Sequence, residues 1–256
     1  MSDALNDWPS VLWLVRHGES AGNVARDAAH AAGRECIELD GRDVDVPLSA
    51  RGTEQAQALG AWFGSQRADT RPEFILTSPY ERARATAGIV ARSCGEGDRP
   101  VAVVDERLRE KEFGILDRLT RQGIEKFHPE QAELRRSLGK FYHRPPGGES
   151  WCDVTLRLRS ALHTLSLHYA GRRVLIVAHQ VVVLCFRYLL ENLSEAQILA
   201  IDAQGDVANC SITDYMLDRH AEKTTPLQLR RYNWTVPLER AGASITRSPD
   251  ANETTL

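Results

Sequence analysis

The chain has 256 residues, of which 42% are hydrophobic and 26% charged, a balance typical of a globular protein and not of a disordered, collagen-like or coiled-coil chain. At roughly 100–200 residues per domain, this length suits one large domain or two small ones, and it is enough to bury a full core. Lys and Arg number 32 against 35 Asp and Glu, for a formal net charge of -3. Without a basic surplus, no nucleic-acid partner is expected.

The cysteines and the apolar stretches exclude further classes of protein. The five cysteines are scattered, odd in number and contain no C-x-x-C pair, so neither a disulfide framework nor a zinc site is expected. The N-terminus lacks the basic region of a signal peptide. The longest apolar stretch, 174–186, is interrupted by His179 and Gln180 and falls short of the roughly 18 residues of a membrane span. We therefore expect a cytoplasmic protein with no membrane partner.

The first half of the chain alternates short apolar runs with helical patterns. In chain order, the predicted elements are a strand over 11–15, a helix over 49–64, a strand over 74–77, a helix over 79–92 and a strand over 101–104. The strands are rich in Val, Ile and Leu without alternation, as in strands buried on both faces of a parallel sheet. Ser49 and Ser78 are placed as N-caps, and Pro79 stands at the first helical position.

The second half continues this alternation after an insertion. Residues 112–149 are expected to form a partly helical cap inserted between two core elements. The elements that follow are a helix over 153–169, a strand over 174–178, an apolar helix over 181–191, a candidate strand over 211–217 and a candidate edge strand over 227–234. This order predicts one α/β domain over 1–240 with right-handed crossovers. Residues 241–256 are polar and expected to be a disordered tail.

Polar side chains follow four of the predicted strands. Arg16 and His17 follow the first strand, Arg82 the second, Glu110 the third and His179 the fourth. Each of them, taken alone, is compatible with a plain structural role. Because ligands bind beyond the carboxyl ends of the strands in an open parallel sheet, we expect these side chains to converge on one site.

Phosphoryl transfer is the chemistry that needs such a set. Two guanidinium groups bind a phosphoryl group through paired, charge-assisted hydrogen bonds. A neutral imidazole such as that of His17 can attack phosphorus and become phosphorylated. Glu110 can protonate the leaving oxygen, His179 can donate to the phosphoryl oxygens, and Gly18 lets the backbone approach closely. An Arg and His cage supplies the electrostatic stabilisation, so no metal ion and no cofactor are expected.

The segment LVRHGESAGN (14–23) resembles the histidine phosphatase superfamily, which is known for its R-H-G signature and includes cofactor-dependent phosphoglycerate mutases and related phosphatases. Further segments resemble the family in the same order: VPLS (46–49), TSPYERA (77–83), LREKEFG (108–114), GGES (147–150) and VAH (177–179). The resemblance covers about residues 12–190. It implies a three-layer α/β/α sandwich with a mostly parallel central sheet and an inserted cap.

The resemblance also implies roles for individual residues. It makes His17 the nucleophile and Glu110 the proton donor, and Arg16, Arg82 and His179 complete the catalytic set. The substrate-binding set that follows comprises Arg16, Gly18, Asn23, Arg82, His179 and Gln180.

One departure from the family pattern bears on the reaction. Gln180 follows His179 where many members have glycine, and with the RPPGGES stretch (144–150) this looks more like the fructose-bisphosphatase branch. The longer insert and the additional basic residues of the mutases have no match here. We therefore expect a metal-independent phosphomonoester hydrolase for a small phosphorylated metabolite. The alternatives are a cofactor-dependent phosphoglycerate mutase and an inactive phospho-ligand binding module.

The segments 30–43 and 112–144 are expected to form the wall of the pocket. They carry six cations that could bind a second anionic group, with a plain surface charge as the alternative for each: Arg34, Arg42, Arg135, Arg136, Lys140 and Arg144. Nothing in these patterns indicates an oligomeric state.

Overall fold

The computed structural model describes residues 8–95, 97, 99–218 and 226–247. The helices and strands are, in chain order, β1 (Val11–Arg16), α1 (Ala21–Ala31), α2 (Ala50–Ser65), β2 (Phe74–Thr77), α3 (Glu81–Ser93), β3 (Val101–Val104), α4 (Arg121–Phe127), α5 (Pro129–Tyr142), α6 (Trp151–His168), β4 (Arg173–Ala178), α7 (Gln180–Leu190), α8 (Glu195–Asp202), β5 (Ile212–Leu217), β6 (Leu227–Trp234) and α9 (Val236–Ala241). None of the helices in these ranges is long and apolar enough to serve as a transmembrane segment.

The strands form one six-stranded sheet in the order β3-β2-β4-β1-β5-β6. β1, β2, β3 and β4 are parallel to their neighbours in this group, whereas β5 runs antiparallel to both β1 and β6. Arg16 at the end of β1 lies opposite Ala178, and Thr77 at the end of β2 lies opposite Val177. The carboxyl ends of β1, β2 and β4 therefore meet at one edge, which is what the convergence of their polar residues requires.

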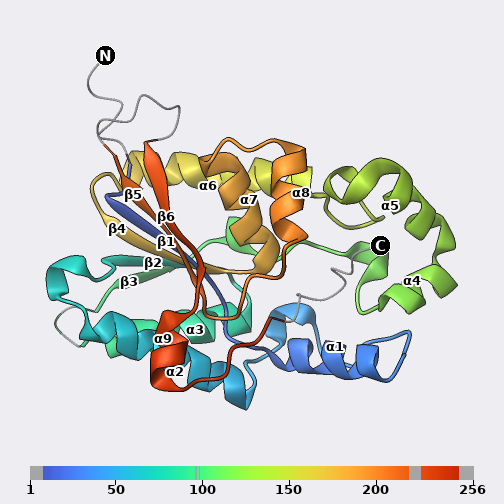
Figure 1. Ribbon diagram of the computed structural model, residues 1–256, viewed down its shortest axis with the longest axis horizontal. Helices are drawn as coiled ribbons and strands as arrows, with labels where there is room; N and C mark the ends of the chain where they lie inside the picture. The colour runs from blue at the N-terminus through green and yellow to red at the C-terminus, as the bar shows by residue number, and fades with distance from the viewer. Residues whose placement is uncertain (1–7, 96, 98, 219–225, 248–256) are drawn as a thin grey trace.

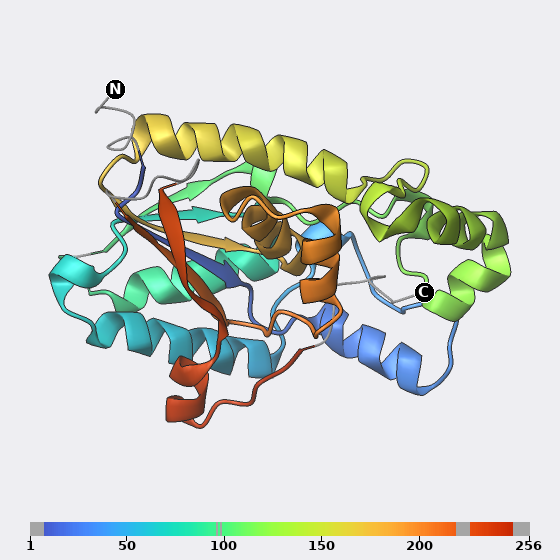
Figure 2. The same ribbon diagram turned by 45° about the horizontal axis from the view of Figure 1, so that its top comes forward.

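Helices cover both faces of the sheet, so the predicted three-layer α/β/α sandwich is confirmed (Figure 1). Alternate residues of β1 point to opposite layers: Leu12 and Leu14 join the core beneath α6 and α7, and Trp13 and Val15 join the core above α2 and α3. Figure 2 shows the sheet between these two layers in a second orientation. Burial of apolar side chains on both faces is the main stabilising contribution to such a sandwich.

Two predicted elements differ from the structure in an informative way. The valines of β3 are exposed, not buried, because β3 lies at the edge of the sheet and pairs only with β2. The helix predicted over 79–92 begins at Glu81, with Tyr80 and not Ser78 at the N-cap position. The hydroxyl of Ser78 instead accepts from the N–H of Tyr80 and contacts His179, so this serine belongs to the site.

The inserted segments lie together beyond the carboxyl ends of the central strands. α4 and α5, within residues 112–149, form a small cluster of their own around Leu116 and Ile124. The N–H of Ile37 donates to the carbonyl of Arg118, which joins the segment after α1 to the cap. α1 was not predicted, because Val24 is the one large apolar residue in 21–31. The helix begins at a capping box formed by Ser20 and Asn23.

The expected tail, residues 241–256, lies partly outside the described residues, which end at 247. Its beginning is bound to the domain. Gln55 donates to the carbonyl of Ser244 and to the hydroxyl of Thr246, and Thr246 donates to Asn209.

Candidate active site

The structure brings the predicted site residues together in the buried region beyond β1, β2 and β4. His17 is 5.1 Å from His179 between ring centroids. Arg82 Nε lies 3.3 Å from Nε2 of His17, and Nδ1 of His179 lies 3.6 Å from a carboxylate oxygen of Glu110. All four side chains are almost completely buried, as is that of Arg16. Charged groups buried at this density require paired interactions, and active sites are where such groups collect.

The position of His17 follows from its backbone. Its N–H donates to the carbonyl of Ala178 on β4, and its carbonyl accepts from Nδ2 of Asn209. Nδ1 of the ring lies 2.7 Å from the carbonyl oxygen of Gly18. Because a carbonyl can only accept, Nδ1 carries the proton, and Nε2 of the neutral ring presents its lone pair towards Arg82. This is the tautomer that a nucleophilic histidine needs.

Gly18 is required by the close packing of the loop after β1 against α2. A Cβ at this position would lie 2.4 Å from the carbonyl oxygen of Gly52, so no side chain fits. The N–H of Gly18 donates to the hydroxyl of Thr86 on α3. In this structure the residue therefore holds the loop after β1 against α2 and α3.

Arg16 is oriented by residues from two other segments. Its Nη1 donates to Oε1 of Gln180 at 3.1 Å and to the carbonyl of Val207 at 2.6 Å. Gln180 in turn donates to Asp206. Gln180 thus acts on the pocket through Arg16, a contact that its place directly after His179 did not reveal. Asn23 is buried, and its Oδ1 accepts from the backbone and hydroxyl of Ser20 in the capping box of α1.

Arg82 has a partner that the sequence analysis missed. Its Nη1 donates to the backbone oxygen and to Oδ1 of Asp43, and its Nη2 donates to Oδ2 of Asp43. The guanidinium also lies over the ring of Tyr80, 4.8 Å from its centroid. No sequence signal links Asp43 to Arg82, because they are 39 positions apart and belong to different segments.

His179 is held between Ser78, Tyr80 and Glu110. Its Nε2 lies 2.8 Å from the hydroxyl oxygen of Ser78, and its ring packs edge-on against Tyr80. Burial and, secondarily, the neighbouring carboxylates raise the pKa of Tyr80. Tyr80 therefore stays a neutral phenol, which donates to Glu112.

The loop that carries Glu110 is fixed by Glu149, the acidic residue of the G-E-S element. Glu149 accepts from Arg157 and Arg109, each at 2.9 Å, and from the N–H of Glu112. Arg157 also donates to the backbone carbonyl of Glu110. Although burial opposes ionisation, the hydrogen bond from Arg157 and the charges of Arg157 and Arg109 lower the pKa of Glu149. The carboxylate is thus ionised at neutral pH and ties α6 to the loop of Glu110.

The cationic residues proposed for a second anionic group are mostly paired within the chain. Five of the six have acidic partners: Arg34 with Glu38, Arg42 with Asp45, Arg136 with Glu133, Lys140 with Asp202 and Arg144 with Asp153. Arg135 lies near the buried His143, whose pKa is lowered to about 4 by burial and by the charges of Arg135 and Lys111. In the part of the chain that the structure describes, no group of three His, Cys, Asp or Glu side chains could hold a metal ion.

Comparison with known proteins agrees with this geometry. The family model described as the histidine phosphatase superfamily (branch 1) matches residues 12–231. A protein of Klebsiella pneumoniae named "Probable phosphoglycerate mutase GpmB" is 32% identical over 209 residues, covering 79% of this chain and 82% of the relative. The protein of the same name from Yersinia enterocolitica is 34% identical over 176 residues, covering 68% and 71%.

Solved structures show the same fold. A mycobacterial glucosyl-3-phosphoglycerate phosphatase in complex with inorganic phosphate superposes with a TM-score of 0.67 at 26% identity, covering 89% of this chain and 99% of that chain. The α-ribazole phosphatase of Shigella flexneri superposes with a TM-score of 0.67 at 23% identity, covering 88% and 96%. Because the family model spans most of the chain, the chain belongs to the histidine phosphatase superfamily, branch 1.

Proposed function

We propose that this protein is a metal-independent phosphomonoester hydrolase that acts on a small phosphorylated metabolite through a phosphohistidine on His17. The observation that carries the proposal is the state of the His17 ring. Nδ1 is committed to the carbonyl of Gly18, while Nε2 faces Arg82, with His179 alongside. An unprotonated nitrogen facing a buried guanidinium is suited to attack the phosphorus of a bound dianion.

The first half of the reaction transfers the phosphoryl group to the enzyme. Nε2 of His17 attacks phosphorus, the bond between phosphorus and the ester oxygen breaks, and protonated Glu110 gives its proton to the departing alkoxide. Arg16, Arg82 and His179 stabilise the negative charge on the phosphoryl oxygens. The carboxyl group of Glu110 is next to His179, so both lie within reach of one phosphoryl group.

The second half returns the enzyme to its starting state. The Glu110 carboxylate takes a proton from a water molecule, whose oxygen attacks the phosphohistidine. The bond between phosphorus and nitrogen breaks, and inorganic phosphate and the neutral His17 ring result. The same residue therefore acts as acid in the first step and as base in the second.

The relatives carry the names of two different reactions, that of a mutase and that of a phosphatase. The relatives in Klebsiella and Yersinia carry a mutase name, whereas the mycobacterial structure that matches at 26% identity is a phosphatase. A mutase needs cations for the distal carboxylate and phosphate of its substrate. Five of the six candidate cations in the pocket wall are paired with acidic residues of the chain. Because Arg82 is itself paired with Asp43, such pairing does not exclude anion binding, and the preference for a hydrolase rests on Gln180 after His179 and on the matching mycobacterial phosphatase.

The proposal is tested by phosphate release over a panel of phosphorylated metabolites and one aryl phosphate, with the wild type and His17→Ala compared. We expect His17→Ala to lower turnover by on the order of 10³-fold or more, because the nucleophile is lost. Acid quenching during turnover should trap phosphate in an acid-labile, alkali-stable bond in the wild type, and a chelator should leave the rate unchanged. Near wild-type activity of His17→Ala would refute the mechanism.

A second incubation separates hydrolase from mutase. The protein is given 3-phosphoglycerate together with a bisphosphoglycerate primer, and both isomerisation and free phosphate are measured. We expect release of phosphate to exceed isomerisation. Fast isomerisation with little free phosphate would establish the mutase instead. Tight binding of phosphate without turnover of any compound in the panel would indicate a binding module.

A further inference from the structure

The carboxylate of Asp43 is bound to Arg82, which holds the phosphoryl group in the proposed function. Nη1 of Arg82 lies 2.8 Å from the backbone oxygen and 3.0 Å from Oδ1 of Asp43, and Nη2 lies 3.1 Å from Oδ2. The Arg82 side chain is 4% exposed and that of Asp43 is 33% exposed. The pair thus joins a buried cation to an anion that reaches solvent.

Asp43 and a phosphoryl group require the same donors. The planar guanidinium fork binds two oxygens of a carboxylate or of a phosphoryl group in the same way. A phosphoryl dianion that entered while Asp43 remained in place would also meet a like charge within a few ångströms, and such a contact is unfavourable in a partly buried site. Binding of the phosphoryl group to Arg82 and pairing of Asp43 with Arg82 therefore oppose each other.

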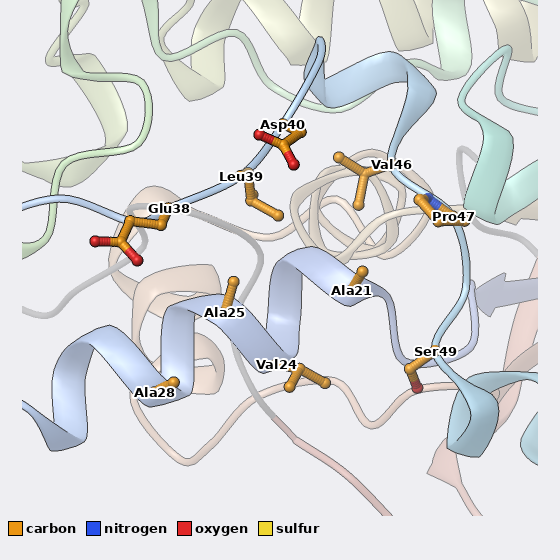
Figure 3. A pocket seen from close by; sticks show the side chains of 10 residues that line it. All are labelled: Ala21, Val24, Ala25, Ala28, Glu38, Leu39, Asp40, Val46, Pro47 and Ser49. Atoms are coloured by element: carbon orange, nitrogen blue, oxygen red, sulfur yellow. The ribbon is translucent and has the colours of Figure 1, made fainter.

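The turn that carries Asp43 lies at the surface, beside an open groove. Asp43 lies in a short 3-10 turn, Asp43–Asp45, between α1 and α2. Both limbs of this segment line a cavity of about 530 Å³ that separates them from α1. Figure 3 shows Leu39 and Val46 on one side of the cavity and Ala21 and Ala25 of α1 on the other. Val46 is buried and the N–H of Ala21 donates to the carbonyl of Pro47, so the limb after the turn is fixed to α1. None of the turn residues 43–45 is buried, so a shift confined to the turn does not require the core to open.

We propose that Asp43 is a product-release residue, which competes with inorganic phosphate for Arg82 after hydrolysis. This inference rests on the proposed function, since it assumes that Arg82 holds the phosphoryl group. Asp43 is tethered beside Arg82, so its effective concentration there is high and constant. Substrate binding displaces it from Arg82. Its return displaces inorganic phosphate and leaves the site in the paired state seen in the structure.

Asp43→Asn is the variant that tests this inference, with Asp45→Asn as its matched control. Asp45 lies on the same turn and carries the same charge, but pairs with the exposed Arg42 and not with Arg82. Isothermal titration calorimetry with inorganic phosphate gives the dissociation constant for each protein, and product inhibition of aryl phosphate hydrolysis gives the inhibition constant. We expect Asp43→Asn to bind phosphate tighter by on the order of tenfold, within the range typical of coupling between competing ligands, and Asp45→Asn to stay close to the wild type.

The direction of the change in phosphate affinity shows whether Asp43 competes with phosphate for Arg82 or holds Arg82 in position to bind it. If Asp43 only holds Arg82 in position, Asp43→Asn will bind phosphate more weakly and lose kcat/KM. That result, or equal tightening in both variants, overturns the inference. The binding experiment is independent of turnover. Tighter phosphate binding by Asp43→Asn in a protein that hydrolyses nothing would therefore support Asp43 as a competitor while refuting the proposed function.

Discussion

Replacement of Glu149 by alanine removes the carboxylate that ties α6 to the loop of Glu110. In the folded protein this leaves the Arg157 guanidinium, whose side chain is 9% exposed, without its 2.9 Å partner, while the side chain of Arg109 is 34% exposed and can turn to solvent. Removing one partner of a buried ion pair costs about 3–5 kcal/mol, and a surface pair contributes about 0–1 kcal/mol. The exposure of Arg157 places the expected loss near 3 kcal/mol, at the lower end of the range for buried pairs.

This loss is measurable as stability and as activity. At about 2–4 °C per kcal/mol for a chain of this size, Glu149→Ala should lower Tm by roughly 6–12 °C. The loop of Glu110 also loses the contacts of Glu149 with Arg109 and with the N–H of Glu112, so kcat should fall more than KM changes. Thermal unfolding by circular dichroism and aryl phosphate kinetics check the two expectations. Asp69→Ala is the control, because Asp69 forms an exposed pair with Arg67.

The same carboxylate predicts a pH dependence. The pKa of Glu149 is lowered in the folded state, opposed by burial but driven by the hydrogen bond and charge of Arg157. A lowered pKa of an acid contributes stability above its unfolded value, and this contribution is lost as the pH falls through the folded value. The difference in unfolding free energy between wild type and Glu149→Gln should therefore be full at neutral pH and shrink on acidification below about pH 4, near the unfolded pKa of a glutamate. A difference that is independent of pH, or a Tm shift no larger than that of Asp69→Ala, would refute the reasoning.

Two further predictions concern the cap and the C-terminal segment. The pKa of His143 is lowered to about 4 by burial and by the charges of Arg135 and Lys111, so the unfolded chain binds the proton more readily than the folded one. Wild-type stability should therefore fall as the pH is lowered from about 6.5 to about 4. Urea unfolding across this range should show a smaller fall for His143→Gln, and an equal fall would contradict the assignment. Thr246→Val removes a hydroxyl that donates to Asn209 and accepts from Gln55, so the free energy of unfolding should drop by about 1–2 kcal/mol in urea unfolding. Because Asn209 donates to the carbonyl of His17, kcat should also fall, with KM little changed. Unaltered kcat in this variant would show that the segment does not support the loop of His17.

The sheet and most of the site could be predicted from the sequence because the relevant signals are local. The buried strands β1, β2 and β4 are mostly apolar runs, and each ends at a polar residue or directly before one, so the edge where Arg16, His17 and His179 meet follows from the parallel order. The edge strand β3 has the same kind of sequence but exposed valines, because strand order is not encoded in a single run. α1 was missed because its apolar face consists mostly of alanines, and its capping box alone is a weak signal.

The partners of the site residues could not be predicted, because each contact joins segments far apart in the chain. Asp43 meets Arg82 only after the segment between α1 and α2 crosses to α3. Asn209 reaches the carbonyl of His17 across 192 positions, and Arg157 reaches the loop of Glu110 from α6.

By itself, the sequence determined the class of fold, the strands that converge and the residue types presented at their ends, because periodicity and strand ends are properties of short segments. Only the tertiary structure decided the tautomer of His17, the pairing of Arg82 with Asp43 and the anchoring of Glu110 through Glu149 and Arg157. Those features depend on which donors and acceptors folding brings within hydrogen-bond distance, and such pairings are fixed by packing and not by the spacing of residues along the chain.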